Sequence, residues 1–381
     1  MTAPLSLRPI VEARDLPPML AAELRERFAA GEAGVAFAPE HDASIGAPLG
    51  ALAGPEAADW PFDIAAPLPV NVPALCAVGE SWWFSRFGGL IGVDGALYNA
   101  TIGEARHGSQ DLSAMPGLRG ETFTPPAAAP QIEAGAVFLP WGATFNYGHF
   151  VIDALPSLLA LEQAGLLEGI PALAPKLTAW QRELIGMAFP DLEVREVEAP
   201  VARVKRAVFA TSMDHFLHHP SGLLADVAAR ILQRAPAGQG ARRVYLSRRG
   251  QSMRVMVGEA AFEKALAARG FTIVRPETMS AGQQIALMRD ADVVVGASGA
   301  ALANAVFLPK GARVVEIQPL NFTSQWVRAA CRQVGVDWRG YVCASPAPAR
   351  QAPVLAKLRR GFKFAFKPSL DDLLAVVDAA L

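Results

Sequence analysis

The chain of 381 residues contains few cysteines and no long apolar run. Cys76, Cys331 and Cys343 are odd in number and lack Cys-x-x-Cys spacing, so neither a disulfide framework nor a cysteine-based zinc site is indicated. We expect all three to be small buried hydrophobic residues. No stretch of about 18 uninterrupted apolar residues occurs, and the first residues lack the basic start and apolar segment of a signal peptide. These absences predict a cytoplasmic protein without a transmembrane segment, while peripheral contact with a membrane stays open.

The chain also lacks an excess of charge of either sign. Its 35 Lys and Arg residues nearly balance 36 Asp and Glu residues, which gives a formal net charge of −1. A nearly neutral chain lacks the excess of basic residues that would indicate nucleic-acid binding, although it is compatible with a local basic site for a phosphorylated ligand. No low-complexity tract occurs, and 52% of the residues are hydrophobic. The chain should therefore fold throughout, and its length suits two domains.

Two common phosphate-binding motifs are missing as well. Residues 292–318 contain an apolar strand, a turn with Gly296 and Gly299, a small-residue helix and a second apolar strand that includes Glu316. The spacing matches neither the P-loop nor the dinucleotide motif GxGxxG, so neither ATP hydrolysis nor nicotinamide binding is favoured. The two glycines and the helix N-terminus predict a nucleotide-sized phosphate site. The alternative interpretation is a tight packing turn in an ordinary α/β domain.

The order of the predicted elements divides the chain at a linker, residues 235–243. After the linker, strands alternate with helices of about a dozen residues, which implies right-handed crossovers and a parallel sheet. We therefore predict a C-terminal Rossmann-like, nucleotide-binding domain over residues 239–365. Residues 1–238 are expected to form an N-terminal α/β domain with an irregular, β-containing extension. Residues 366–381 should form a C-terminal helix with a Ser N-cap, and such a helix can pack back on the N-terminal domain.

Two groups of polar residues accompany the glycine turn. Arg248, Arg249 and Arg254 come directly after a predicted strand, at the carboxyl edge where open α/β sheets bind ligands. Arginine suits a diphosphate there because its planar guanidinium forms bidentate charged hydrogen bonds, and the alternative is a solvated basic turn. His149 and Asp153 lie four residues apart on a predicted helix, so the carboxylate can hold the imidazole in one tautomer as a general base. The alternative is a buried histidine satisfied by the aspartate.

A third polar cluster lies at residues 214–219, where three histidines follow an aspartate. This composition is compatible with a metal site. The proline that follows it and the lack of a second such cluster favour a loop that contacts substrate or solvent.

Taken together, these segments resemble the signature blocks of glycosyltransferase family 61. The similarity covers residues 131–345 and rests on NYGHFVIDALP, YLSRRGQSMR followed by GE, a Gln-Ile helix, and GASGAALAN followed by VVEI. It implies an α/β, GT-B-like fold with two Rossmann-like domains facing a cleft. It also implies an inverting mechanism and a nucleotide-sugar donor held mainly by the C-terminal domain. The chain departs from the family at Ser298, where the family has His, and at Gly258, where the family has Asn.

The residue patterns and the resemblance together predict two sets of site residues. The donor-binding set is Arg248, Arg249, Arg254, Gly296, Ser298, Gly299, Asn304 and Glu316. The catalytic set is His149 and Asp153, either of which could be the base. Arg248 and Arg254 would stabilise the leaving diphosphate together with the helix N-terminus, and Glu316 would accept hydrogen bonds from ribose hydroxyls.

The sequence thus predicts an inverting glycosyltransferase, a hexosyl- or pentosyltransferase with a nucleotide-sugar donor. The expected donor is UDP-linked, and the expected acceptor is a carbohydrate or glycolipid hydroxyl in surface polysaccharide or lipopolysaccharide synthesis. Arginines and a helix N-terminus should neutralise the diphosphate, so neither a metal ion nor another cofactor is expected. The alternative is a non-catalytic GT-B-like protein that binds sugar or nucleotide, which the serine at position 298 favours. The Asn-Tyr-Gly-His block disfavours an epimerase, and the missing dinucleotide motif disfavours a dehydrogenase.

Overall fold

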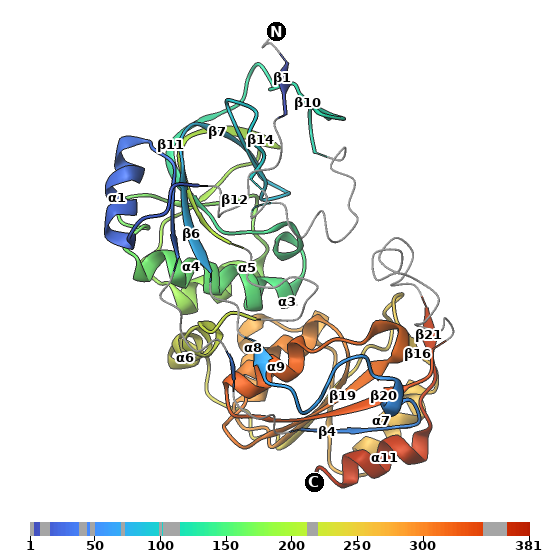
Figure 1. Cartoon of the computed structure of the whole chain (residues 1–381). Helices are drawn as coiled ribbons and strands as arrows, with labels where there is room; N and C mark the ends of the chain where they lie inside the picture. Colours follow the sequence, from blue (N-terminus) through green and yellow to red (C-terminus); the bar gives the residue numbers. More distant parts are fainter. Residues whose placement is uncertain are drawn as a thin grey trace. The chain divides into compact units, whose positions relative to one another are not determined.

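The computed structural model describes residues 4–7, 16–37, 44–45, 50–69, 73–98, 101, 115–211, 220–345 and 364–381. The chain forms two compact units (Figure 1). Unit 1 comprises Met1–Ala43 and Asn71–Phe216, and unit 2 comprises Ser44–Val70 and Leu217–Leu381. Each unit contains a sheet with parallel strands and packed helices, so the predicted α/β fold class is confirmed. Among the helices of the described ranges, none is long and apolar enough to cross a membrane.

The main sheet of unit 1 combines four parallel strands with antiparallel neighbours. Its order is β13 (Val194–Glu196), β12 (Ala172–Ala174), β11 (Gln131–Val137), β14 (Val201–Ala210), β6 (Ala74–Val78) and β2 (Gly34–Phe37), and β7 (Ser81–Phe84) and β8 (Leu90–Gly92) join it beside β14. Strands β11, β12, β13 and β14 are parallel, and the chain order reverses between β11 and β14. Such a reversal is a topological switch point, where open α/β sheets bind ligands at the carboxyl ends of the strands.

The core of unit 1 shows why its short apolar runs form strands. Cys76 and Val78 of β6 point to one face of the sheet and pack with Trp83 of β7 in one cluster. Helix α1 (Ala21–Ala30) places Leu24 and Phe28, four residues apart, on its buried side, and it packs against β2, β6 and β14 (Figure 1). The three cysteines of the chain are buried and free, as predicted.

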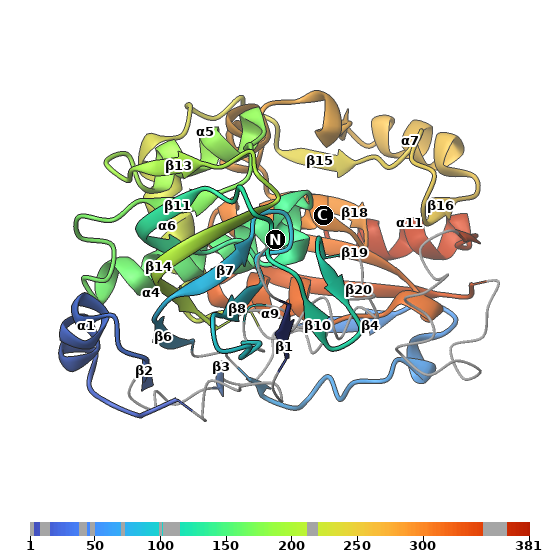
Figure 2. The same ribbon diagram turned by 90° about the horizontal axis from the view of Figure 1, so that it is seen from above.

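The sheet of unit 2 is wholly parallel. Its order is β17 (Thr272–Val274), β15 (Arg243–Leu246), β18 (Val293–Ala297), β19 (Arg313–Pro319), β20 (Asp337–Cys343) and β4 (Gly50–Ala53). Figure 2 shows β15, β18, β19 and β20 as successive arrows that run in the same direction. The chain order reverses between β15 and β18, which makes the carboxyl ends of these two strands the switch point of unit 2.

Helices cover both faces of this sheet. On one face, α7 (Glu259–Ala267) and α11 (Leu370–Asp378) pack in a core cluster with alternate residues of the strands. The 3₁₀ helix η7 (Ala300–Phe307) contacts three further helices of unit 2. They are α6 (Leu224–Arg234), α8 (Ala281–Met288) and α9 (Trp326–Gln333). Ser280 and Gln283 form a capping box at the start of α8, and Ser369 caps α11, as predicted.

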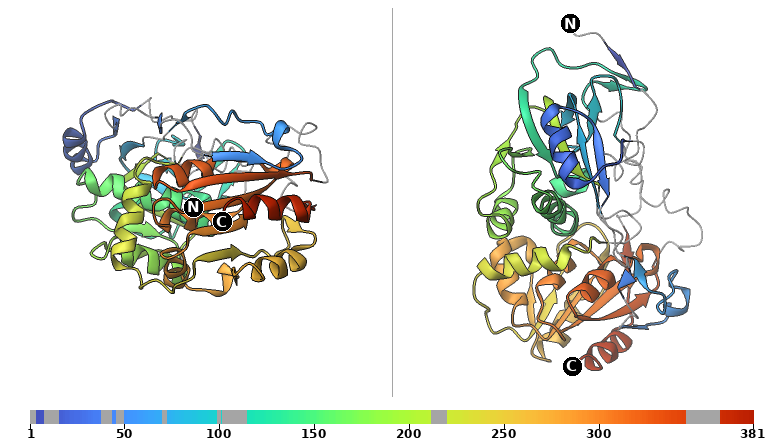
Figure 3. Two further views of the ribbon diagram at one scale, coloured as in Figure 1. Left: turned by 90° about the horizontal axis from the view of Figure 1, so that it is seen from below. Right: turned by 60° about the vertical axis from the view of Figure 1, so that its left-hand side comes forward.

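The division of the chain differs from the predicted boundary between residues 238 and 239. Residues 217–238 lie in unit 2 because α6 packs against η7 and α9. Residues 44–70 also belong to unit 2, where β4 pairs with β20 and covers what would otherwise be an open edge of the sheet. The C-terminal helix α11 packs within unit 2, where Leu373 and Val377 enter the core cluster (Figure 3).

A buried arginine attaches residues 50–69 to unit 2. Arg328 of α9 is 1% exposed, and its guanidinium donates hydrogen bonds to the carbonyl oxygens of Asp63 and Ile64. The guanidinium also lies 5.9 Å from the centroid of the Trp60 ring. Burial lowers the pKa of Arg328, because it removes the cation from water, and the Asp63 carboxylate opposes that shift.

We expect Arg328→Met to lower the free energy of unfolding by about 2 to 4 kcal/mol, because methionine fills similar space but cannot donate to the carbonyl oxygens of Asp63 and Ile64. The measurement is urea denaturation followed by circular dichroism. Arg242→Lys is the control, since Arg242 is exposed in a surface pair with Asp292. An Arg328→Met protein as stable as the wild type would contradict this account of how residues 50–69 are held.

Candidate functional site

Unit 2 brings two of the predicted arginines together at the switch point of its sheet. Arg248 follows β15, and Gly299 follows β18. A Cβ atom built on Gly299 would lie 2.5 Å from Arg248 Nη1 and 3.4 Å from Arg254 Nη2. Both guanidinium groups therefore converge on the turn that opens η7, and a side chain at position 299 would displace them. We call Arg248, Arg254 and Gly299 the arginine cluster.

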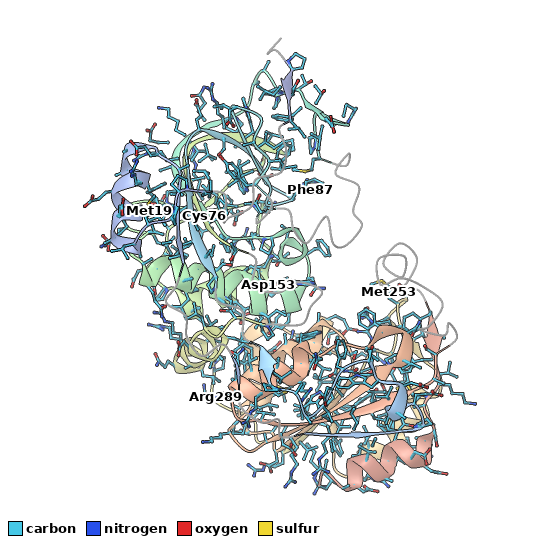
Figure 4. All side chains as sticks on the ribbon, in the orientation of Figure 1. Met19, Cys76, Phe87, Asp153, Met253 and Arg289 are labelled. Carbon is cyan, nitrogen blue, oxygen red and sulfur yellow. The ribbon has the colours of Figure 1, made fainter. Side chains whose placement is uncertain are left out.

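Arg248 is a partly buried cation held by its own loop. Its Nη2 donates to the carbonyl oxygen of Met253 at 2.9 Å, and its backbone N–H donates to Glu259 Oε1 at 2.7 Å (Met253 is labelled in Figure 4). Burial lowers the pKa of Arg248, and the Glu259 carboxylate opposes that shift. Within the described parts of the chain, its buried Nε has no hydrogen-bond partner.

Arg254 adopts an unusual backbone conformation beside it. Its φ of 51° is the only positive φ of a non-glycine residue within the described ranges, and such a conformation costs on the order of 1 kcal/mol. The guanidinium lies 4.3 Å from the centroid of the Phe322 ring. Burial, and after it repulsion from Arg248, lower the pKa of Arg254 to about 9. An anion between the two guanidinium groups would relieve this repulsion.

Glu259 fixes the start of the loop that carries Arg248, a role that the sequence did not predict. It is the first residue of α7 and is 5% exposed. Its Oε1 accepts hydrogen bonds from Tyr245 Oη at 2.9 Å and from the Arg248 backbone N–H at 2.7 Å. The Gly-Glu pair that opens this helix was the signal, because an acidic residue in a first helical turn can fix the preceding loop.

In unit 1 the predicted His149–Asp153 contact is present. His149 Nδ1 lies 2.8 Å from Asp153 Oδ2, with the His149 side chain 32% exposed and the Asp153 side chain 1% exposed. Asn146 caps the helical run, since its side chain accepts from the backbone N–H groups of Gly148 and His149. The carboxylate sits in the π-helical turn η5 (Phe150–Ala154), a form that is rare and frequent at functional sites (Asp153 is labelled in Figure 4).

This pair lies on the helical run that follows β11, one of the two switch-point strands of unit 1. The run comprises α3 (Tyr147–His149), η5 and α4 (Leu155–Gln163), and α4 packs against β14. A cavity beside the carboxyl ends of β11 and β14 is lined by residues 137–140, Phe209 and Ser157, among others. Ser157 comes four residues after Asp153 in the same helical run.

Several predicted donor-binding residues are instead part of the core of unit 2. Gly296 lies inside β18, where a Cβ would meet Leu302 at 3.2 Å, so this glycine serves packing. The Ser298 hydroxyl donates to Glu316 Oε1 at 2.6 Å, and Trp338 Nε1 donates to Glu316 Oε2 at 2.8 Å. Glu316 is 0% exposed, and burial raises its pKa. Its carboxylate therefore presents no accessible oxygen to a ribose, which corrects the predicted role.

Two further predicted donor-binding residues have partners within unit 2. Asn304 is 0% exposed, and its Nδ2 donates to Gln284 Oε1 at 2.8 Å, so it ties η7 to α8 within the core. Arg249 is exposed and forms a salt bridge with Glu263 at 2.7 Å. Asn304 pairs with Gln284 because a buried amide needs a polar partner. Arg249 pairs with Glu263, which lies on the neighbouring turn of α7.

The described ranges contain no cluster of three or more His, Cys, Asp or Glu residues that could hold a metal ion. One Asp-x-Asp spacing occurs in the chain, from Asp290 to Asp292. It precedes β18 at the amino end of the strand, opposite the edge that carries the arginine cluster. Asp290 accepts from the Gly240 backbone N–H, and Asp292 pairs with Arg242. The predicted histidine loop at residues 214–219 lies outside the described residues.

Comparison with known proteins adds one finding. A family model described as Glycosyltransferase 61 matches residues 147–315. The matched stretch includes the His149–Asp153 pair of unit 1 and the arginine cluster of unit 2. None of the curated proteins matches the chain.

Proposed function

Residues 147–315 belong to glycosyltransferase family 61, so the protein is a glycosyltransferase, and from this premise we propose the reaction it catalyses. The proposed reaction is an inverting transfer of a sugar from a UDP-linked donor to a hydroxyl of a carbohydrate or glycolipid acceptor. Surface polysaccharide or lipopolysaccharide is the proposed product. The observation that carries the donor assignment is the convergence of Arg248 and Arg254 on the Gly299 turn at the switch point of unit 2.

The arginine cluster would act on the leaving group. When the bond between the anomeric carbon and the diphosphate oxygen breaks, the electron pair stays on the diphosphate and negative charge grows there. Two poorly solvated guanidinium groups, fixed before the reaction, stabilise that charge more than they stabilise the intact donor. The backbone N–H groups at the start of η7 lie beside them and add to this field.

The His149–Asp153 pair would act on the acceptor. The Asp153 carboxylate accepts the Nδ1–H of His149, which leaves the lone pair on Nε2. As the acceptor oxygen forms its bond to the anomeric carbon, its proton passes to Nε2, and Asp153 stabilises the imidazolium that results. Asp153 is a second candidate for the base itself.

The direct test is a screen of nucleotide sugars for release of free nucleoside diphosphate, with and without acceptor extracts. We expect acceptor-dependent release of UDP from a UDP-sugar, and inversion at the anomeric carbon by nuclear magnetic resonance of the product. A retained configuration would contradict the inverting mechanism. Release of a different nucleoside diphosphate alone would contradict the proposed donor.

We expect transfer to continue at an undiminished rate in excess EDTA. Guanidinium groups supply the positive charge that a divalent ion supplies elsewhere, and the Asp290 and Asp292 carboxylates are engaged at the opposite edge of the sheet. The measurement compares initial rates of UDP release with EDTA, with manganese and with neither. Complete loss of activity in EDTA that manganese restores would show that a metal ion carries this charge.

A further inference from the structure

Strands β16 (Val255–Met256) and β21 (Ala365–Phe366) form a separate two-stranded parallel sheet at the margin of unit 2 (Figure 1). The pairing extends beyond β16, because the Val257 backbone N–H donates to the Phe366 carbonyl oxygen at 2.8 Å. Met256 and Phe366 are buried in the core cluster of unit 2, so one face of this small sheet packs inward. Since alternate residues of a strand point to opposite faces, their neighbours in the chain face outward.

The outer face of this sheet is apolar. Val255 is 41% exposed and Val257 is 47% exposed, and Met253, two residues earlier in the chain, is 42% exposed. The other exposed large hydrophobic side chains of the described ranges are scattered singly along the chain. Single exposed hydrophobic residues are ordinary on a protein surface, whereas three within five residues indicate a contact surface. We call Met253, Val255 and Val257 the apolar patch.

The apolar patch belongs to the same segment as the arginine cluster. Arg254 lies between Met253 and Val255, and its guanidinium converges on the Gly299 turn while both neighbouring side chains are exposed. A surface that contacts the patch therefore lies close to the place where we propose that the diphosphate leaves.

Basic residues are concentrated in the two stretches of sequence that contain β16 and β21. Residues 248–257 include three arginines and no acidic residue. Residues 350–372 include six Lys and Arg residues and two Asp residues, a formal net charge of +4, whereas the whole chain carries −1. Among them Lys367 is exposed, and its position one residue after β21 places it on the outer face of the sheet. Apolar side chains beside a local excess of positive charge match the surface of a bilayer that contains anionic lipids.

We propose that the outer face of the β16–β21 sheet binds the surface of a membrane that contains anionic lipids. Val255 and Val257 enter the headgroup region, and Lys367 lies beside lipid phosphates. A protein partner fits less well, because three side chains expose far less area than the roughly 800 Å² that each partner buries in a stable complex. Membrane contact here would also keep the arginine cluster close to a glycolipid acceptor, and this last step alone rests on the proposed function.

The test is co-sedimentation of the full chain with vesicles of phosphatidylcholine alone or of phosphatidylcholine mixed equally with phosphatidylglycerol. We expect the mixed vesicles to bind about tenfold or more tightly than the neutral ones, and added salt to weaken that binding. The double variant Val255→Thr with Val257→Thr keeps the shape of both side chains but makes them polar, so it should weaken binding to mixed vesicles about tenfold or more.

Two further variants separate the patch from the rest of the surface. Lys367→Glu should weaken binding to mixed vesicles about threefold or more and leave the weak binding to neutral vesicles unchanged. Val93→Thr is the matched control, since Val93 is an exposed valine of unit 1, and it should bind both kinds of vesicle as the wild type does. Urea denaturation followed by circular dichroism should show that every variant is folded.

Three outcomes overturn the inference. They are a wild type that does not sediment with mixed vesicles, a double valine variant that binds them as tightly as the wild type, and a Val93→Thr protein that loses as much binding as the double variant. Self-association of the wild type that the double variant abolishes would show instead that a second copy of the chain covers the patch. None of these results bears on the donor or the reaction, because the vesicle assay contains neither nucleotide sugar nor acceptor.

Discussion

Replacing Arg248 by alanine should lower the efficiency of sugar transfer about 30-fold to 1000-fold, which corresponds to about 2 to 4 kcal/mol. The side chain is partly buried, its Nη1 approaches the Gly299 turn, and its Nε has no hydrogen-bond partner within the described residues. Loss of a charged contact to phosphate in such a place is costly because water replaces it poorly. Lysine should restore only part of the activity, since an ammonium group cannot form the bidentate contact.

The measurement pairs calorimetric UDP binding with initial rates of transfer. Arg249→Ala is the matched control, because Arg249 is the next residue but its guanidinium is exposed and paired with Glu263. We expect that control to retain both binding and transfer within about threefold. Circular dichroism should show that both variants fold. If Arg248→Ala binds UDP as tightly as the wild type, the arginine cluster is not the diphosphate site.

Much of the fold could be predicted because unit 2 depends on local patterns. The apolar runs after residue 240 alternate with helices of regular length, and each helix carries its own start or stop signal, such as the Ser280 cap and Gly270 with its φ of 79°. Strand β4 could not be predicted in the same way. Its four residues, Gly50–Ala53, are extended because the edge of β20 is available to pair with them, and that partner lies almost 300 residues later in the chain.

The structure brings two of the predicted donor-binding residues together and buries two others. Arg248 and Arg254 converge on the Gly299 turn at a switch point, where open α/β sheets bind ligands. Glu316 and Asn304 belong to the segments that resemble the family blocks, yet both are fully buried. Glu316 accepts a hydrogen bond from Ser298, and Asn304 donates one to Gln284. A single sequence does not reveal which side of a strand or helix faces the core when nearly all neighbours are apolar.

Ser298 takes part in a buried network of hydrogen bonds with Glu316 and Trp338. Its hydroxyl points to Glu316, whose second oxygen accepts from Trp338, so the three side chains form one buried chain of hydrogen bonds. The serine therefore supports the turn through Glu316. Positive charge at this edge comes from Arg248 and Arg254, and the departure from the family pattern does not remove it.

Replacing His149 by alanine should lower the turnover number about 10²-fold to 10⁴-fold while UDP affinity stays within about twofold. The imidazole is 32% exposed and its Nδ1 is held by a buried carboxylate, the arrangement that keeps a histidine in one tautomer near neutral pH. The variant should fold normally, because Asn146 caps the helix through backbone N–H groups and not through the ring. Each variant is measured twice, by UDP calorimetry and by the rate of transfer.

Asp153→Asn distinguishes the two candidate bases in the same pair of measurements. If Asp153 only orients the imidazole, the amide can still accept a hydrogen bond from His149, and turnover should fall less than in His149→Ala. If the carboxylate itself takes the proton, turnover should fall more, since an amide has no basic oxygen. A His149→Ala protein that transfers sugar at the wild-type rate would instead show that the contact between His149 and Asp153 is structural, a histidine satisfying a buried carboxylate within the helix of unit 1.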